Sequence, residues 1–191
     1  ISTTLTQLAN VMAIIANKGW YYLPHLIDSV EGVDDYEMLA RFKTKHRTKN
    51  IAESIFEEVH EGMQGTMEFG TGAYAKVPGI NVCGKTGTVE NAYRGESLKD
   101  HAFFGAFAPR ENPRIAIAVM CENAGFGATS AAPIASLLIE KYLRDSIAGP
   151  ERKAKIEQLA NMNLIPPQMK RLMTKQDSTK KVTLKKSIAK K

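Results

Sequence analysis

Four consecutive residues near the middle of the chain, Lys85-Thr-Gly-Thr88, are of types that could do chemistry. With Gly79 and Gly84 ahead of them, they fit the phosphate-binding pattern G-x-x-x-x-G-K-[ST]. The same run fits a Lys-Thr-Gly strand motif used in acyl transfer through a serine. The first pattern indicates nucleotide hydrolysis and the second indicates peptide-bond chemistry, so the neighbouring elements have to distinguish them.

The residues around the motif favour a strand over a phosphate loop. A phosphate loop ends a strand and opens a helix, whose amides and dipole hold the phosphates. Here Ile80 and Val82 alternate as in a strand, and 86–89 is a poor helix start because it holds a glycine and three β-branched residues. The following runs, 101–108 and 114–121, suit an antiparallel hairpin rather than a parallel crossover. A nucleotide hydrolase therefore stays only a remote alternative.

As a strand, the motif could hold the acyl donor of a peptide reaction. An accessible strand edge pairs with an extended peptide, and Lys85 would bring positive charge beside a nucleophile and a substrate carboxylate. The hydroxyl groups of Thr86 and Thr88 can hydrogen-bond that carboxylate. Gly87 would leave room for a ligand against the backbone, and an amide beyond it can face the developing oxyanion.

Two helices are predicted ahead of this strand. The first spans 4–18, where Thr4 and Gln7 form a capping box and apolar residues recur at three- and four-residue steps. The second starts after Asn50 as its N-cap. Residues 29–49 between them are predicted to form a polar loop with short strand pieces. The inward stripe of the second helix is predicted to be Ile51, Ile55, Val59 and Met63.

A hairpin and a last core helix are predicted after the motif. The strands 101–108 and 114–121 flank a Pro-rich turn, and the second is an apolar run of the kind that is covered on both faces. The helix spans 131–145 with Pro133 in its first turn. Its predicted inward residues are Ile134, Leu137, Leu138 and Tyr142.

The chain of 191 residues is long enough for one domain or part of one. We predict the domain to span 1–149 and a basic extension to span 150–191, first helical over 151–162 and then disordered. The net charge of +6 arises in the extension, which carries twelve Lys or Arg against three Asp or Glu. Because this extension lacks interleaved aromatic residues, a solvated tail is favoured and no nucleic-acid partner is expected.

The cysteines and histidines do not form a metal-binding pattern. Cys83 and Cys121 lie in no C-x-x-C or Cys/His spacing, and the four histidines are scattered. We therefore expect no metal and no cofactor. The sequence contains no signal peptide and no apolar run near the ~20 residues of a membrane span. Because the chain opens at Ile1 within a helical pattern, we expect it to be a piece of a longer protein.

Short segments in order along 3–145 resemble class B penicillin-binding protein transpeptidase domains, and most closely their elongation-type branch, penicillin-binding protein 2. The resemblance implies an α/β (α+β) fold of the penicillin-binding/β-lactamase-like type, an antiparallel sheet between helices, of which this chain would be the C-terminal portion. The matching segments are Thr4–Asn10 with Ile15–Gly19, Pro24–Leu26, Val59–Met63 with Gly70–Gly72, Gly84–Thr88, the hairpin pieces Asp100–His101, Phe104–Pro109, Asn112–Pro113 and Glu122–Asn123, and Ala132–Ile134.

The resemblance also implies a function. A serine-type D,D-transpeptidase cross-links peptidoglycan stem peptides through an acyl-enzyme and binds β-lactams. On this basis Lys85, Thr86 and Gly87 are catalytic-motif residues, and Thr88 binds substrate and gives its N–H to the oxyanion hole. The implied partners of the whole protein are elongation-complex membrane proteins. The implied location is the periplasmic face of the bacterial inner membrane, reached through an N-terminal anchor that this chain lacks.

The sequence departs from the family pattern in ways that affect these expectations. Leu5 replaces the usual Pro and Phe103 a frequent Trp, both interpreted as packing changes. The family's S-x-N motif does not occur, and S-x-x-K occurs only at Ser178–Lys181 and Ser187–Lys190, after the strand motif and in the Lys-rich tail, where we interpret both as chance matches. We therefore expect no nucleophile in this chain and no activity from it alone.

Two further expectations follow from the resemblance. The alternative function is a non-catalytic binding module of the same fold. Since the sheet order of the family places Cys83 and Cys121 two strands apart, both are expected to be free thiols. Because part of the domain is missing from this chain, apolar surface should be exposed, so self-association is a further hypothesis.

Overall fold

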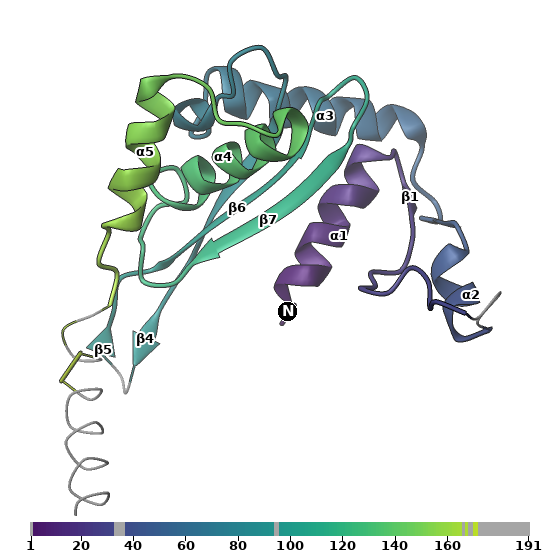
Figure 1. The fold of residues 1–191 in the computed structure, drawn as a ribbon, viewed down its shortest axis with the longest axis horizontal. Helices are drawn as coiled ribbons and strands as arrows, with labels where there is room; N and C mark the ends of the chain where they lie inside the picture. Colours follow the sequence, from purple (N-terminus) through teal and green to yellow (C-terminus); the bar gives the residue numbers. More distant parts are fainter. Residues whose placement is uncertain (1, 33–36, 94–95, 166, 168–169, 172–191) are drawn as a thin grey trace, which may run out of the picture.

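The computed structural model describes residues 2–32, 37–93, 96–165, 167, 170 and 171. Its centre is a three-stranded antiparallel sheet of β3 (Cys83–Val89), β6 (His101–Ala108) and β7 (Ile115–Cys121), in the order β3-β6-β7 (Figure 1). The middle strand β6 is largely buried. Antiparallel pairing and the strand order agree with the prediction, and the phosphate-loop alternative is wrong because the motif lies within β3 and opens no helix.

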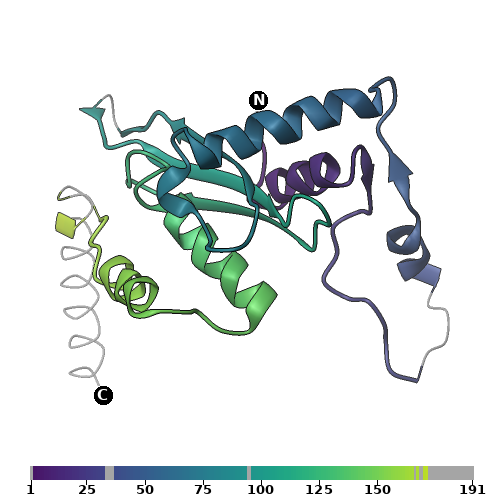
Figure 2. The ribbon, with the colours of Figure 1, turned by 90° about the horizontal axis from the view of Figure 1, so that it is seen from above.

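Helices cover both faces of this sheet, as Figure 2 shows from above. Side chains alternate along a strand, so neighbours on β6 face opposite helices. Met12 of α1 (Leu5–Ala16) packs on Gly105, since a Cβ on Gly105 would come 2.8 Å from the Met12 sulfur. Phe104 packs in the opposite layer with Ile139 of α4 (Ala131–Arg144). The predicted fold, an antiparallel sheet between helices, is confirmed.

The start of α1 is as predicted, and its end is shorter. Thr4 accepts from the Gln7 amide at 3.2 Å, and the Gln7 side chain accepts from the Thr4 amide at 2.8 Å, which completes the capping box. The helix ends at Ala16 and continues into a turn with positive φ at Lys18 and Gly19. A Cβ on Gly19 would lie 2.6 Å from the Thr48 hydroxyl oxygen, so this turn requires glycine.

The second predicted helix is α3 (Glu53–Glu68), and both its start and its inward face differ from the prediction. Asn50 has a φ of 63° and lies outside the helix, and Ala52 is the N-cap without a side-chain bond. Ile51, Ile55 and Val59 are exposed, whereas Met63 is buried as predicted. The buried stripe is Phe56, His60, Met63 and Met67, with His60 Nε2 at 2.8 Å from the Ile15 carbonyl oxygen.

The inward face of α4 also differs in part. Leu137 is buried and Ile134 is half-buried, but Leu138 and Tyr142 are exposed. The residues packed against the sheet are the small Ala131, Ala132 and Ala135 together with Ile139. Ser136 and the fully buried Glu140 instead contact Arg152. A close approach of helix and sheet therefore depends on small side chains, and the larger apolar ones are left outside.

Residues 20–52 form a separate group of short elements. β1 (Trp20–Tyr21) pairs with β2 (His46–Arg47), and α2 (Glu37–Lys43) lies near them at the side of the sheet domain (Figure 1). The strand pieces agree with the prediction, but α2 was not predicted. The remaining short elements are the 3-10 turn η1 (Ala73–Ala75) and the hairpin of β4 (Ala92–Tyr93) and β5 (Glu96–Ser97).

The predicted helix after the domain is α5 (Pro150–Ala160), with Pro150 in its first turn. Arg152 on this helix contacts Glu140 of α4, so the first part of the extension lies against the preceding residues. The boundary between 149 and 150 stays a prediction, and the predicted disorder falls mainly outside the described residues. Cys83 and Cys121 are free thiols, as predicted, near opposite ends of the sheet.

Candidate active-site strand

The Lys-Thr-Gly-Thr motif occupies an open edge of the sheet. One side of β3 pairs with β6 in the register Lys85↔Gly105 and Thr88↔Ala102. No other strand pairs with β3 among the described residues. Lys85 and Thr88 are exposed, whereas Thr86 and Gly87 are half-buried. The strand therefore offers an edge that an extended ligand could join by main-chain pairing.

The charged and hydroxyl groups of the motif start from opposite faces of the sheet. Strand alternation puts Lys85 on the face of α1, and Thr86 and Thr88 on the face of α4. The Lys85 ammonium group curves back along the strand, and its Nζ donates to the Thr86 carbonyl oxygen at 2.8 Å. The positive charge thus lies beside the backbone of the motif, where a ligand carboxylate near the threonine hydroxyls could reach it.

A residue that sequence reasoning did not assign, Thr71, supports the motif from the preceding loop. The hydroxyl oxygens of Thr71 and Thr86 are 2.7 Å apart and share a hydrogen bond. This loop follows α3, and Gly72 donates its N–H to the Thr66 carbonyl at 3.0 Å to hold the turn. The only sequence signal for this contact was the Gly70–Gly72 segment of the family resemblance.

Gly87 packs against an aromatic ring, and its role beside a ligand stays a prediction. A Cβ at this position would lie 3.0 Å from Cδ1 of Phe103. From the loop after β7, a Cβ on Gly127 would come 3.0 Å from the Gly87 carbonyl oxygen. The middle of the motif is thus packed closely, and the Phe103 ring contributes to this packing.

A polar network holds the far end of β3. The Asn91 side chain donates to the Asn123 side-chain oxygen at 2.7 Å and to the Lys99 carbonyl at 3.1 Å. Asn123 in turn donates its N–H to Nδ1 of His101 at 3.0 Å, so that nitrogen is the acceptor and Nε2 carries the proton of the neutral ring. The network ties the residues after β3 to the start of β6 and to the loop after β7.

Two arginines hold the loop that leads into β3. Arg144 donates to the Pro78 carbonyl, and Arg152 donates to the Lys76 carbonyl at 3.2 Å. Both arginines pair with Glu140, whose side chain is fully buried. Burial by itself would raise the pKa of Glu140. Hydrogen bonds from Ala148 and Arg152 and the charges of both arginines outweigh this effect, so the pKa lies below its ordinary value.

Three expectations from the sequence concern a nucleophile, a metal site and a membrane span. Both S-x-x-K sequences, at 178–181 and 187–190, lie outside the described residues. Among the residues described, no group of three or more His, Cys, Asp or Glu side chains could hold a metal ion. In the same part of the chain, no helix is long and apolar enough to cross a membrane.

An antiparallel sheet between helices, with an edge strand carrying Lys-Thr-Gly-Thr, is the arrangement expected of a penicillin-recognising transpeptidase domain. The family model for the penicillin-binding protein transpeptidase domain matches residues 1–140. The chain therefore belongs to the penicillin-binding protein transpeptidase family, and the similar proteins below place it with the class B members, in agreement with the resemblance found in the sequence.

Similar proteins support this assignment. The peptidoglycan D,D-transpeptidase MrdA of Haemophilus influenzae is 30% identical over 167 residues, which are 79% of this chain and 25% of that protein. The crystal structure of Pseudomonas aeruginosa PBP2 with WCK 5153 has a TM-score of 0.61 at 30% identity, over 75% of this chain and 30% of that one. The structure of penicillin-binding protein A from Mycobacterium tuberculosis as an imipenem acyl-enzyme complex has a TM-score of 0.57 at 29% identity, over 71% of this chain and 30% of that one. The chain thus spans between a quarter and a third of the length of these proteins.

Proposed function

We propose that this chain supplies the substrate-holding strand of a serine-type peptidoglycan D,D-transpeptidase that also binds β-lactams. The observation that carries the proposal is the open edge of β3, where Lys85 and Thr88 are exposed and Thr71 bonds to Thr86, while hydrogen bonds hold the segments before and after the strand. Similarity to a D,D-transpeptidase and to a β-lactam acyl-enzyme supports the same conclusion.

In the proposed reaction, a serine oxygen attacks the carbonyl carbon of a D-Ala-D-Ala bond, and the leaving D-Ala amine takes up the proton. An amine of a second stem peptide then attacks the ester, forms the cross-link and returns the serine hydroxyl. Within this chain, Thr86 and Thr88 would bind the substrate carboxylate, Lys85 would add positive charge, and the Thr88 amide would stabilise the oxyanion. Because the serine comes from other residues, the chain alone should be inactive.

The proposed location of the whole protein is the periplasmic face of the bacterial inner membrane. There its partners would be peptidoglycan stem peptides and the membrane proteins of the elongation complex. The similarity to MrdA and PBP2 supports this proposal.

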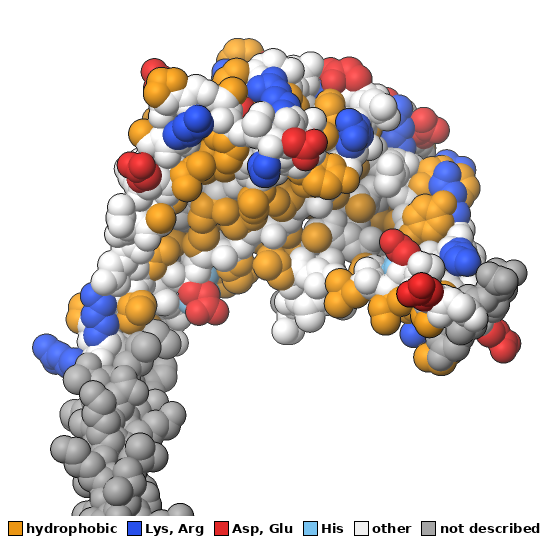
Figure 3. Space-filling model, viewed as in Figure 1, with side chains coloured by type: hydrophobic (Ala, Val, Ile, Leu, Met, Phe, Trp, Pro, Cys, Tyr) orange, Lys and Arg blue, Asp and Glu red, His pale blue; other side chains and the backbone are white. Residues whose placement is uncertain are grey.

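We also propose that the opposite edge of the sheet, β7, is covered by another strand, and that a second copy of the chain covers it when the chain is alone. The residues of β7 are partly exposed although all seven are apolar. Figure 3 shows hydrophobic side chains gathered along this concave side. An uncovered apolar edge favours association. Sedimentation velocity should therefore give a concentration-dependent mass, and a monomer at every concentration would contradict this proposal.

A chimaera tests the catalytic proposal. Residues 1–149 would replace the matching segment of Pseudomonas aeruginosa PBP2, and fluorescent penicillin would report acylation. We expect labelling of the chimaera and a loss of about a hundredfold or more in labelling rate with Lys85→Ala, a change in an electrostatic group at the reacting centre. Lys49→Ala, at an exposed lysine away from β3, is the matched control and should label normally.

The alternative, a non-catalytic binding module, makes the opposite prediction for the same chimaera. A folded chimaera with normal thermal stability and no labelling would favour it. This alternative arises because S-x-N does not occur within the 191 residues and S-x-x-K occurs only after the strand motif.

A further inference from the structure

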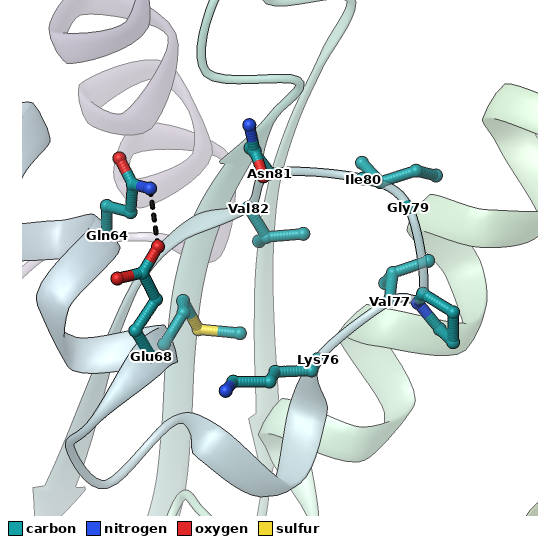
Figure 4. Close-up of a pocket in the computed structure, with 10 residues that line it drawn as sticks. Gln64, Glu68, Lys76, Val77, Gly79, Ile80, Asn81 and Val82 are labelled. Carbon is teal, nitrogen blue, oxygen red and sulfur yellow. Dashed lines mark hydrogen bonds between the residues drawn. The ribbon is translucent and has the colours of Figure 1, made fainter.

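A pocket of about 410 Å³ lies between the end of α3 and the loop that leads into β3 (Figure 4). Its apolar floor consists of Met67, Val77 and Val82, each exposed by 4% or less. Gly79 allows the loop to turn around the opening, with a φ of 70°. The volume is within the range of pockets that hold small ligands, about 300–1,000 Å³.

Two opposite charges stand at the opening of this pocket. Figure 4 shows the Lys76 side chain extending from the loop toward α3, which carries the Glu68 carboxylate beside Gln64. Gln64 donates to Glu68 at 2.6 Å and accepts from Arg110, which fixes the carboxylate. Within the described residues, no ion pair joins Glu68 to Lys76 and no side chain or carbonyl binds the Lys76 ammonium group, so both charges can face a ligand.

The loop is held in place independently of the Lys76 side chain. The Lys76 carbonyl accepts from Arg152 at 3.2 Å, and the neighbouring Pro78 carbonyl accepts from Arg144. On the opposite wall, Asn81 donates its side-chain N–H to Glu111 at 2.6 Å. The walls are thus fixed by backbone and side-chain bonds, while the two charged groups at the opening are left for recognition.

We propose that this pocket binds a free amino acid that carries an ammonium group, a carboxylate group and an apolar side chain. Glu68 binds the ammonium group and Lys76 binds the carboxylate, because charge-assisted hydrogen bonds are the stronger ones. The apolar side chain lies on Met67 and Val82. This site is distinct from the Lys-Thr-Gly-Thr edge and does not depend on the proposed function.

The floor of the pocket adjoins the active-site strand. A Cβ on Gly72 would lie 2.6 Å from the Met67 sulfur, and a Cβ on Gly84 would lie 2.9 Å from it. Met67 thus packs between the loop that carries Thr71 and the start of β3. A ligand on the floor would contact this side chain directly, which makes the Met67 methyl group a local reporter of binding.

A set of three related probes tests the proposal. Leucine carries both charges, leucinamide lacks the carboxylate, and 4-methylpentanoate lacks the ammonium group. Each is titrated into the full chain with methyl-labelled methionine, and the Met67 signal is assigned through Met67→Leu. We expect saturable shifts of this signal with leucine and at least about tenfold weaker binding of each analogue, since each loses a charged hydrogen bond.

Variants of the two charged residues complete the test. Glu68→Gln and Lys76→Met should each weaken leucine binding about tenfold or more, and Glu58→Gln, on an exposed part of the same helix, should leave it unchanged. The proposal is overturned if leucine does not shift the Met67 signal, if the three probes bind equally, or if Glu68→Gln and Lys76→Met bind leucine as the unaltered chain does. Unchanged thermal unfolding of both variants confirms that each still folds.

Discussion

The sheet has two outer edges, and they differ in nearly every physical property. The edge at β3 carries Lys85 and two threonines and is braced by Thr71, by two arginines and by the network around Asn123. The edge at β7 is apolar from Ile115 to Cys121, with no charged residue along it and Met120 exposed by 38%. Proteins usually protect open edges with charge or cover them. The difference supports both proposals, that β3 stays open to a ligand and that β7 is covered by protein.

The largest expected effect concerns the brace behind β3. Glu140→Ala leaves Arg144 and Arg152 without their buried partner and frees the loop at Lys76 and Pro78. We expect the free energy of unfolding to fall by about 3–5 kcal/mol in urea titrations. Glu157→Ala, on the exposed side of α5, is the control and should change it by less than about 0.5 kcal/mol. A similar small loss for Glu140→Ala would show that the brace contributes little.

The same carboxyl group should make the brace sensitive to acid. The folded pKa of Glu140 is lowered from 4.5, so its stabilising contribution is complete at higher pH and is lost as pH falls through the folded value. The difference in unfolding free energy between the unaltered chain and Glu140→Gln should therefore be smaller at about pH 3.5 than at about pH 6. Glu57 and Glu111 also have lowered pKa values but are present in both proteins. A constant difference at both pH values would contradict this assignment.

A charge on β7 should make the two edges more alike. Met120→Lys places a cation on the exposed apolar edge, as natural edge strands do. We expect self-association, followed by sedimentation velocity, to weaken about tenfold, or about 1.4 kcal/mol. Lys85→Met removes a charge from the opposite edge and should not weaken association. Equal effects from both substitutions would show that the β7 edge is not the interface.

The two cysteines report on the two edges separately. Cys83 begins β3 and is fully buried, and burial raises its thiol pKa to about 11. Cys121 ends β7 and is half-buried, and burial raises its pKa too. Iodoacetamide at about pH 8 should modify Cys121 roughly tenfold faster, as peptide mapping would show, because access and thiolate content both favour it. Faster modification of Cys83 would mean that the β3 side opens first.

The smallest expected effect is at the loop that supports the motif. Thr71→Val removes the hydrogen bond to Thr86 and should lower the free energy of unfolding by about 1 kcal/mol. Hydrogen exchange should rise at Thr86 and Gly87 and stay the same in β7. Thr88→Val, at an exposed threonine of the same strand, is the control and should leave both measurements nearly unchanged.

Local sequence patterns predicted the elements of both edges, but not what braces them. The capping box of α1 and the three main strands follow from short-range signals. The face of α3 was predicted wrongly because buried His60 does not count as apolar, whereas exposed Ile55 and Val59 do. α2 was missed because it has only seven residues and lies within a stretch that is otherwise polar and charged.

The motif residues of the site could be predicted from the sequence, but the contacts that support them could not. Lys85 and Thr88 could be assigned from the motif, and both lie at the open edge as expected. The Thr71–Thr86 bond and the Glu140–Arg152 pair join residues 15 and 12 positions apart on different elements, so no local pattern shows them. The packing of Phe103 on Gly87 depends on the register of β3 and β6, which the sequence leaves open.

The central claim is that the β3 edge holds the substrate while this chain lacks the nucleophile. The direct test is to incubate the isolated, isotope-labelled chain with penicillin G, then to measure its intact mass and its amide spectrum. The account predicts an unchanged mass and reversible shifts confined to the residues around Lys85–Thr88. A covalent adduct, or an unperturbed β3 at saturating penicillin, would contradict it.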